Sequence, residues 1–115
     1  MRTLGIDTSN YTTSVCVYDS ETGEAVQKKL LLPVKQGEKG LRQSDAVFHH
    51  TVRLYPLVQE LFAEIGVGID AIGVSQRPRD AEGSYMPCFL VGENAAKCIG
   101  AVAGKPVHGF SHQAG

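Results

Sequence analysis

Residues 4–18 have the sequence LGIDTSNYTTSVCVY, in which two apolar runs flank a hydroxyl-rich turn, a pattern that predicts a β-hairpin. Asp7 ends the first strand, and the hydroxyls and backbone N–H groups after it suit the oxygen atoms of an anion. A carboxylate beside hydroxyls also suits a metal-bound nucleotide phosphate, although an ordinary polar turn explains the same residues. The predicted nucleotide- or phosphate-binding residues are Asp7, Thr8, Ser9, Asn10, Thr12 and Thr13.

Length and composition describe a small domain without a strong bias in charge. The 115 residues carry a net charge of −1 and are 43% hydrophobic, which is enough for one core. This balance argues against a chain that binds nucleic acid or membrane over its whole surface. The 3 cysteines have no disulfide-like spacing, the start has no signal-peptide pattern, and no apolar run approaches the roughly 20 residues that cross a bilayer. A cytoplasmic protein without a membrane span is therefore expected.

Changes in hydrophobic periodicity predict the element order βββαβαβ. The expected strands and helices cover residues 3–8, 13–18, 25–34, 44–65, 69–75, 87–103 and 105–109. Short turns make the first three strands antiparallel, whereas the two helical crossovers imply parallel pairing of the later strands. Pro56 lies inside the first helical pattern, where Leu54, Tyr55, Val58 and Leu61 belong to one apolar stripe. A kinked single helix is expected there.

This order is that of the ribonuclease H-like half-domain, pairs of which form the actin-like ATPases. Residues 4–9 (LGIDTS) resemble the opening Leu-Gly-Ile-Glu-Thr-Ser of the TsaD/Gcp family, formerly called glycoproteases or O-sialoglycoprotein endopeptidases. Residues 50–58 (HTVRLYPLV) are similar to that family's His-Val-Arg-Lys-Thr-Val-Pro-Leu-Ile segment, and residues 90–92 open a similar second helix. The resemblance implies an α/β fold with helices packed on a mixed sheet. Residues 1–115 would form one N-terminal subdomain, truncated before a second domain.

The end of the chain carries the predicted metal ligand. Residues 110–115 (FSHQAG) resemble the approach to the family's His-Met-Glu-Gly-His motif, with His112 in the place of the first histidine. Two histidines one helical turn apart can present both imidazoles to one cation. The resemblance therefore implies a divalent metal of the iron or zinc class at His112, but only in a longer chain. His49 and His50, about 100° apart around a helix, are expected to serve packing or the surface.

Two departures separate this chain from the family pattern. The family has a cysteine followed by acidic residues in the first turn, where this chain has Asn10, Tyr11 and Thr12, and Asp7 stands in place of a glutamate. The carboxylates implicated in catalysis in that family have no counterpart here, so no catalytic residue is predicted. These departures are those expected of a divergent paralogue.

The resemblance implies a role in tRNA modification. TsaD-like enzymes transfer a threonylcarbamoyl group from an adenylate onto the adenosine beside the anticodon. On this interpretation the chain is a fragment of a metal- and nucleotide-binding transferase, inactive alone, with ATP or an adenylate as ligand and tRNA as a partner of the full-length protein. A sugar-kinase-like phosphotransferase domain of the actin type is one alternative.

A second alternative is a non-catalytic scaffold. TsaB-like relatives share the half-domain, lack the two-histidine motif and act by dimerising with TsaD. A half-domain without its neighbours should also expose apolar surface on its sheet or helices. A homodimer, or pairing with a TsaB-like partner, is therefore expected.

Overall fold

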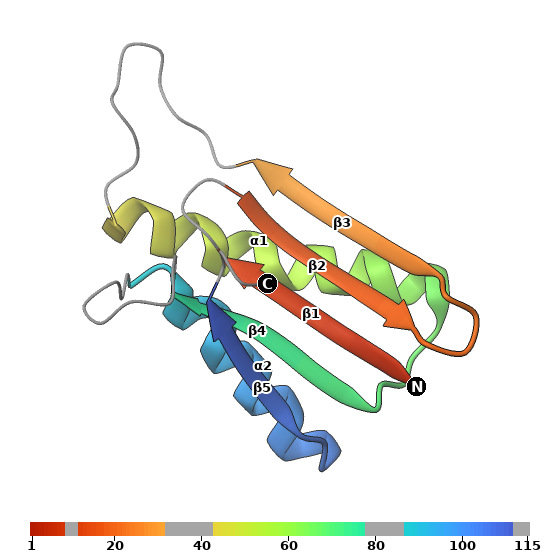
Figure 1. Ribbon diagram of the computed structural model, residues 1–115. Helices are drawn as coiled ribbons and strands as arrows, with labels where there is room; N and C mark the ends of the chain where they lie inside the picture. Colours follow the sequence, from red (N-terminus) through yellow and green to blue (C-terminus); the bar gives the residue numbers. More distant parts are fainter. Residues whose placement is uncertain (9–11, 32–42, 78–86, 112–115) are drawn as a thin grey trace.

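A computed structural model describes residues 1–8, 12–31, 43–77 and 87–111, which form one five-stranded sheet and two helices (Figure 1). The elements are β1 (Arg2–Thr8), β2 (Thr12–Asp19), β3 (Ala25–Leu31), α1 (Gln43–Ile65), β4 (Ala71–Arg77), α2 (Phe89–Ala103) and β5 (Val107–Ser111). The predicted order βββαβαβ is confirmed.

Several predicted boundaries were wrong. The third strand ends at Leu31, and the rest of its predicted span falls in 32–42, outside the described residues. The second helix begins at Phe89 because Pro87 lies in the preceding turn, where its carbonyl accepts a hydrogen bond from Leu90 N at 3.0 Å. That helix ends at Ala103, as predicted, and its C-cap Gly104 has a left-handed φ of 68°, which favours glycine. β5 begins at Val107 and not at Lys105, because Lys105 N still donates to the carbonyl of Gly100 in the cap.

The sheet combines an antiparallel hairpin region with a parallel region. Its strand order is β3-β2-β1-β4-β5. β2 is antiparallel to both β1 and β3, whereas β4 is parallel to both β1 and β5. The carboxyl ends of β1, β4 and β5 therefore meet at one edge, which is also where β2 begins (Figure 1). Ligands of open α/β sheets bind outside the carboxyl ends of such parallel strands.

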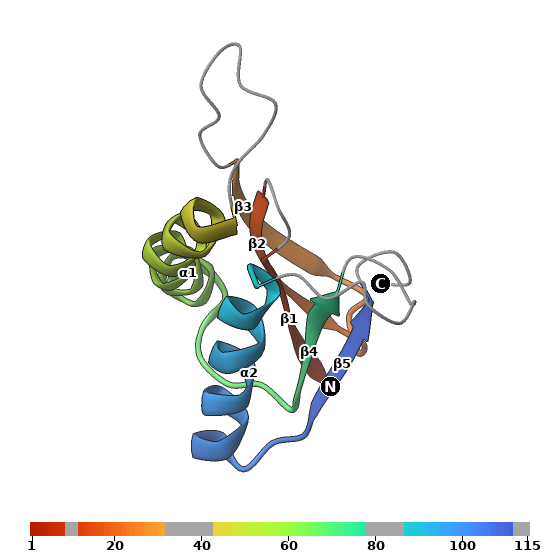
Figure 2. The same cartoon turned by 90° about the vertical axis from the view of Figure 1, so that its left-hand side faces the viewer.

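Both helices pack on the same face of the sheet, and within the described residues the other face carries no helix (Figure 2). α1 packs on β2 and β3, and α2 packs on β4 and β1. Strand alternation sends one set of side chains toward the helices. The core is Leu4, Ile6, Val15, Val17, Leu54, Leu57, Leu61, Ile72, Val74 and Ala96. No helix in the described part of the chain is long and apolar enough to cross a membrane.

α1 is a single helix across Pro56, as predicted, and the kink expected at residues 52–55 stays a prediction. Pro56 lies on the exposed side, and Leu54, Leu57 and Leu61 supply the buried side at spacings of three and four. The predicted apolar stripe was wrong at Tyr55, which is 68% exposed. The helix therefore buries a narrower stripe than its sequence indicates.

Arg2 ties the start of β1 to the end of α1. Its guanidinium donates to the carbonyls of Gly66 at 2.9 Å, Val67 at 3.2 Å and Ile65 at 3.5 Å. The last turn of α1 has no basic residue of its own, so Arg2 supplies the positive charge that a helix carboxyl end favours.

Replacing Arg2 by methionine is expected to lower the free energy of unfolding by about 1–2 kcal/mol, because charged hydrogen bonds to the helix end are lost. Urea unfolding followed by circular dichroism measures this loss. Lys97→Met is the control, since it removes only an exposed ion pair with Glu93 within one helix and should cost less. Equal losses of unfolding free energy in the two variants would contradict the stabilisation of the end of α1 by Arg2.

Candidate functional site

The described residues of the predicted site, Asp7, Thr8, Thr12 and Thr13, lie at the edge where β1 ends and β2 begins. In the register of this hairpin, Asp7 lies opposite Ser14 and Thr8 lies opposite Thr13. Strand alternation places Asp7, Ser14 and Thr12 on the helix-free face, where all three are half-buried. A carboxylate and two hydroxyls thus gather on one face at the carboxyl end of β1.

Thr8 and Thr13 take the opposite face and are completely buried. The Thr8 hydroxyl donates to the carbonyl of Cys88 at 2.9 Å and accepts from the N–H of Gly92 at 3.1 Å. The Thr13 hydroxyl forms a hydrogen bond with Nδ1 of His50, 2.7 Å away. These hydroxyls bond to the two helices and face away from the helix-free side of the sheet. Asp7 and Thr12, which take that side, are the described candidates for contact with a phosphate.

Three of the predicted residues, Ser9, Asn10 and His112, lie outside the described residues. His112 follows Ser111, the last residue of β5, and β5 ends at the same edge as β1. Sequence reasoning missed Ser14, which faces the same way as Asp7. Side chains two residues apart in a strand take the same face of the sheet, so Ser14, two residues after Thr12, could have been predicted from the sequence.

The described residues supply no metal centre of their own. Within residues 1–8, 12–31, 43–77 and 87–111, no three His, Cys, Asp or Glu side chains lie close enough together to hold a metal ion. A metal at His112 therefore stays a prediction for a longer chain, and no chemistry below is assigned to it.

Cys88 lies where α2 starts, close to the acid of the candidate site. Burial raises the pKa of its thiol to about 11, and the nearby Asp7 carboxylate adds to the rise. Cys98, by contrast, is exposed on α2.

Iodoacetamide at about pH 8 is expected to modify Cys98 and to leave Cys88 unmodified in the folded chain, because the thiolate is the reactive form. Mass spectrometry of the alkylated protein measures this, and both thiols should react in urea. Native Cys88 reacting as fast as Cys98 would contradict the buried environment described for it.

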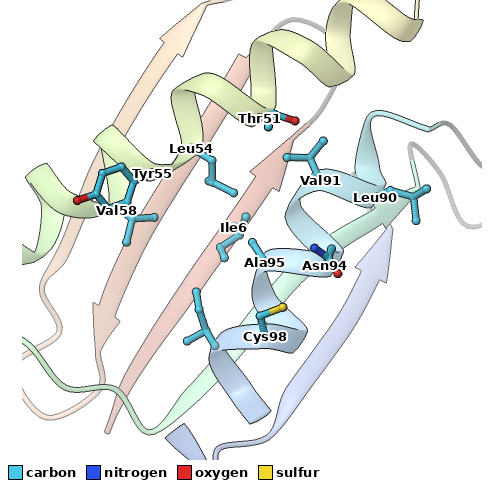
Figure 3. Close-up of a pocket in the computed structure, with 11 residues that line it drawn as sticks. Ile6, Thr51, Leu54, Tyr55, Val58, Leu90, Val91, Asn94, Ala95 and Cys98 are labelled. Atoms are coloured by element: carbon cyan, nitrogen blue, oxygen red, sulfur yellow. The ribbon is translucent and has the colours of Figure 1, made fainter. Parts of the chain in front are cut away.

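An apolar groove separates the two helices on the side away from the sheet. Its volume is ≈ 620 Å³, and Ile6 of β1 lies at its floor between Leu54 of α1 and Ala95 of α2 (Figure 3). Two large apolar side chains that line it are exposed to solvent, Tyr55 at 68% and Leu90 at 48%. Phe48 at 60% and Val52 at 48% are further exposed apolar residues of α1. The predicted exposure of apolar surface on the helices is confirmed.

The sequence and the fold of this chain are similar to those of known proteins. The model of the TsaD family, described as tRNA N6-adenosine threonylcarbamoyltransferase, matches residues 32–115. The chain belongs to the TsaD family. The predicted family is thereby confirmed from residues beyond the β1–β2 hairpin.

Curated TsaD relatives extend the similarity over the whole chain. A tRNA N6-adenosine threonylcarbamoyltransferase of Herminiimonas arsenicoxydans is 34% identical over 120 residues, which cover 100% of this chain and 33% of the relative. The protein of the same name from Solidesulfovibrio magneticus is 35% identical over 117 residues, 97% of this chain and 30% of the relative. The chain thus spans about a third of the length of these TsaD relatives.

A solved structure confirms the fold expected of a TsaD half-domain. YeaZ from Pseudomonas aeruginosa superimposes with a TM-score of 0.67 at 22% identity, over 96% of this chain and 42% of YeaZ. The predicted α/β fold, a mixed sheet with helices packed on it, is therefore confirmed.

Proposed function

We propose that this chain is the phosphate-binding and helix-pairing part of a TsaD-type threonylcarbamoyltransferase. The observation that carries the proposal is the match to the TsaD family combined with Asp7, Thr12 and Ser14 on one face at the carboxyl end of β1. The family match favours this function over a sugar-kinase-like phosphotransferase domain. ATP or an adenylate is the proposed ligand, and tRNA is the proposed substrate of a longer protein.

The side chains at this edge of the sheet would each contact a different part of the bound nucleotide. The Asp7 carboxylate would bind Mg²⁺, or a water on it, and the hydroxyls of Thr12 and Ser14 would donate to phosphate oxygens. Without the family's acidic first turn, the chain alone would bind nucleotide without turning it over. For a longer chain we propose a divalent metal of the iron or zinc class at His112, the residue that follows Ser111 in the sequence, where β5 ends.

Asp7→Asn is expected to weaken binding of Mg-ATP about ten-fold, because it removes the charge proposed to face the cation. Isothermal titration of the 115-residue chain measures the affinity. Asp19→Asn is the matched control, since Asp19 ends β2 at the opposite end of the same hairpin. Equal affinities for the wild type and Asp7→Asn would contradict the proposed site.

The groove between α1 and α2 favours a second role as a pairing surface. Exposed apolar side chains of both helices line or border it, and an apolar surface of this kind gains free energy when a partner covers it. We propose that the helix pair of a second copy of this chain docks there in solution. A TsaB-like half-domain, with its own helix pair, is the proposed partner of a longer protein.

A further inference from the structure

A buried polar link joins α1 to the candidate phosphate site. It consists of the hydrogen bond between His50 Nδ1 and Thr13 Oγ1, 2.7 Å long, between two side chains that are both 0% exposed. We propose that His50 is a positioning residue: through Thr13 it holds in place the strand ends that carry the proposed phosphate-binding residues. This proposal rests on the proposed function.

The chemistry of burial supports a specific role for this pair. A hydroxyl and an imidazole lose their bonds to water when they enter a core, and a hydrogen bond between them in a fixed geometry recovers part of that loss. A pair of apolar side chains would pack in the same space without that requirement. The hydrogen bond therefore fixes where the start of β2 lies relative to α1.

The neighbouring strand is fixed in the same way from the other helix. Thr8, opposite Thr13 in the hairpin, bonds Cys88 and Gly92 at the start of α2. A Cβ atom on Gly92 would lie 3.0 Å from the Thr8 hydroxyl, so the contact is already close. The Thr8–Thr13 pair is thus held from both helices at once.

The phosphate-facing residues are the direct neighbours of this pair. Asp7 precedes Thr8 and Thr12 precedes Thr13, and each neighbour takes the opposite face of the sheet. A shift of the Thr8–Thr13 pair would move both neighbours because alternate side chains share one backbone. A small displacement of binding groups is enough to weaken a site that depends on alignment.

The test compares variants that remove the hydrogen bond between His50 and Thr13 with variants that keep a hydrogen-bonding atom at the same position. Thr13→Val has nearly the shape of threonine without the hydroxyl, and His50→Leu removes the imidazole. Thr13→Ser keeps the hydroxyl, and His50→Asn keeps a polar atom at the position of Nδ1. Thr22→Val is the control, since Thr22 accepts a hydrogen bond in the turn at the far end of the hairpin.

Mg-ATP titrated into each folded variant at equal temperature gives the first readout. Thr13→Val and His50→Leu are expected to weaken binding about ten-fold, whereas Thr13→Ser, His50→Asn and Thr22→Val stay near the wild type. A purely structural role would lower the unfolding temperature without changing the affinity of the molecules that remain folded. Affinities of Thr13→Val and His50→Leu equal to that of Thr22→Val would overturn the proposal.

Amide hydrogen exchange gives a second readout that does not need a ligand. Loss of the His50 link should speed exchange at Thr8 and Thr13 while Leu4 and Val17, at the other end of the same strands, keep their protection. If the wild type binds no Mg-ATP, the proposed function fails, and local exchange at Thr8 and Thr13 still supports the positioning of this edge by His50. Hydrogen exchange that rises evenly along β1 and β2 would overturn the positioning role of His50.

Discussion

Gly100→Leu is expected to lower the free energy of unfolding by about 3 kcal/mol or more, a large part of the stability of a small domain. Gly100 is buried in α2 where the helix crosses the sheet. A Cβ atom there would lie 2.5 Å from Cγ2 of Val107 and 3.0 Å from the carbonyl oxygen of Lys105. The carbonyl belongs to the backbone, so a larger side chain would push α2 away from β4 and β5.

Urea unfolding followed by far-ultraviolet circular dichroism measures this effect. Ala101→Leu is the matched control, because Ala101 is the next residue of the same helix and is exposed. Leucine at that position should leave the unfolding midpoint close to that of the wild type. A Gly100→Leu variant as stable as Ala101→Leu would show that α2 does not lie against the sheet at this point.

Charged substitutions in the groove between α1 and α2 are expected to have a large effect on dimerisation. We expect the chain to dimerise at micromolar concentration and the double variant Tyr55→Glu, Leu90→Glu to be a monomer under the same conditions. Both residues line the groove and are exposed, Tyr55 at 68% and Leu90 at 48%, so the monomer can carry the charges at its surface. In the proposed interface the two carboxylates would be removed from water without partners, which weakens association about a hundred-fold or more.

Sedimentation velocity over a concentration series measures the association. Val67→Glu is the control, since Val67 is an apolar residue with 88% exposure that lies beyond α1 and does not line the groove. It should dimerise like the wild type. A wild type that stays monomeric, or a Tyr55→Glu, Leu90→Glu variant that still dimerises, would contradict pairing through this groove.

Local sequence patterns predicted most of the fold. Alternation in the first hairpin, three- and four-residue spacings in α1, and glycines at the helix ends predicted the right elements in the right order. The boundary errors at Leu31, Phe89 and Val107 arose where propensity alone does not decide the last residue of an element. Tyr55 was misplaced because the width of a buried stripe depends on what packs against it.

The candidate site was predicted less completely than the fold. The hydroxyl-rich turn was recognised, but its residues divide between the two faces of the hairpin, and that division follows from register and alternation. The engagement of Thr13 by His50 depends on where α1 crosses β2, about forty residues along the chain, which no local pattern contains. The groove likewise requires both helices to be placed.

Nuclear magnetic resonance of the ¹⁵N-labelled chain during a Mg-ATP titration tests for a phosphate site at the end of β1. We expect the changes in backbone amide shift to cluster at Asp7, Thr12 and Ser14 on addition of about 1–5 mM Mg-ATP. Adenosine lacks the phosphates, so adenosine with Mg²⁺ should leave the chemical shifts of these amides unchanged. Shifts absent from this edge, or the same shifts with adenosine, would contradict a phosphate-binding site at the end of β1.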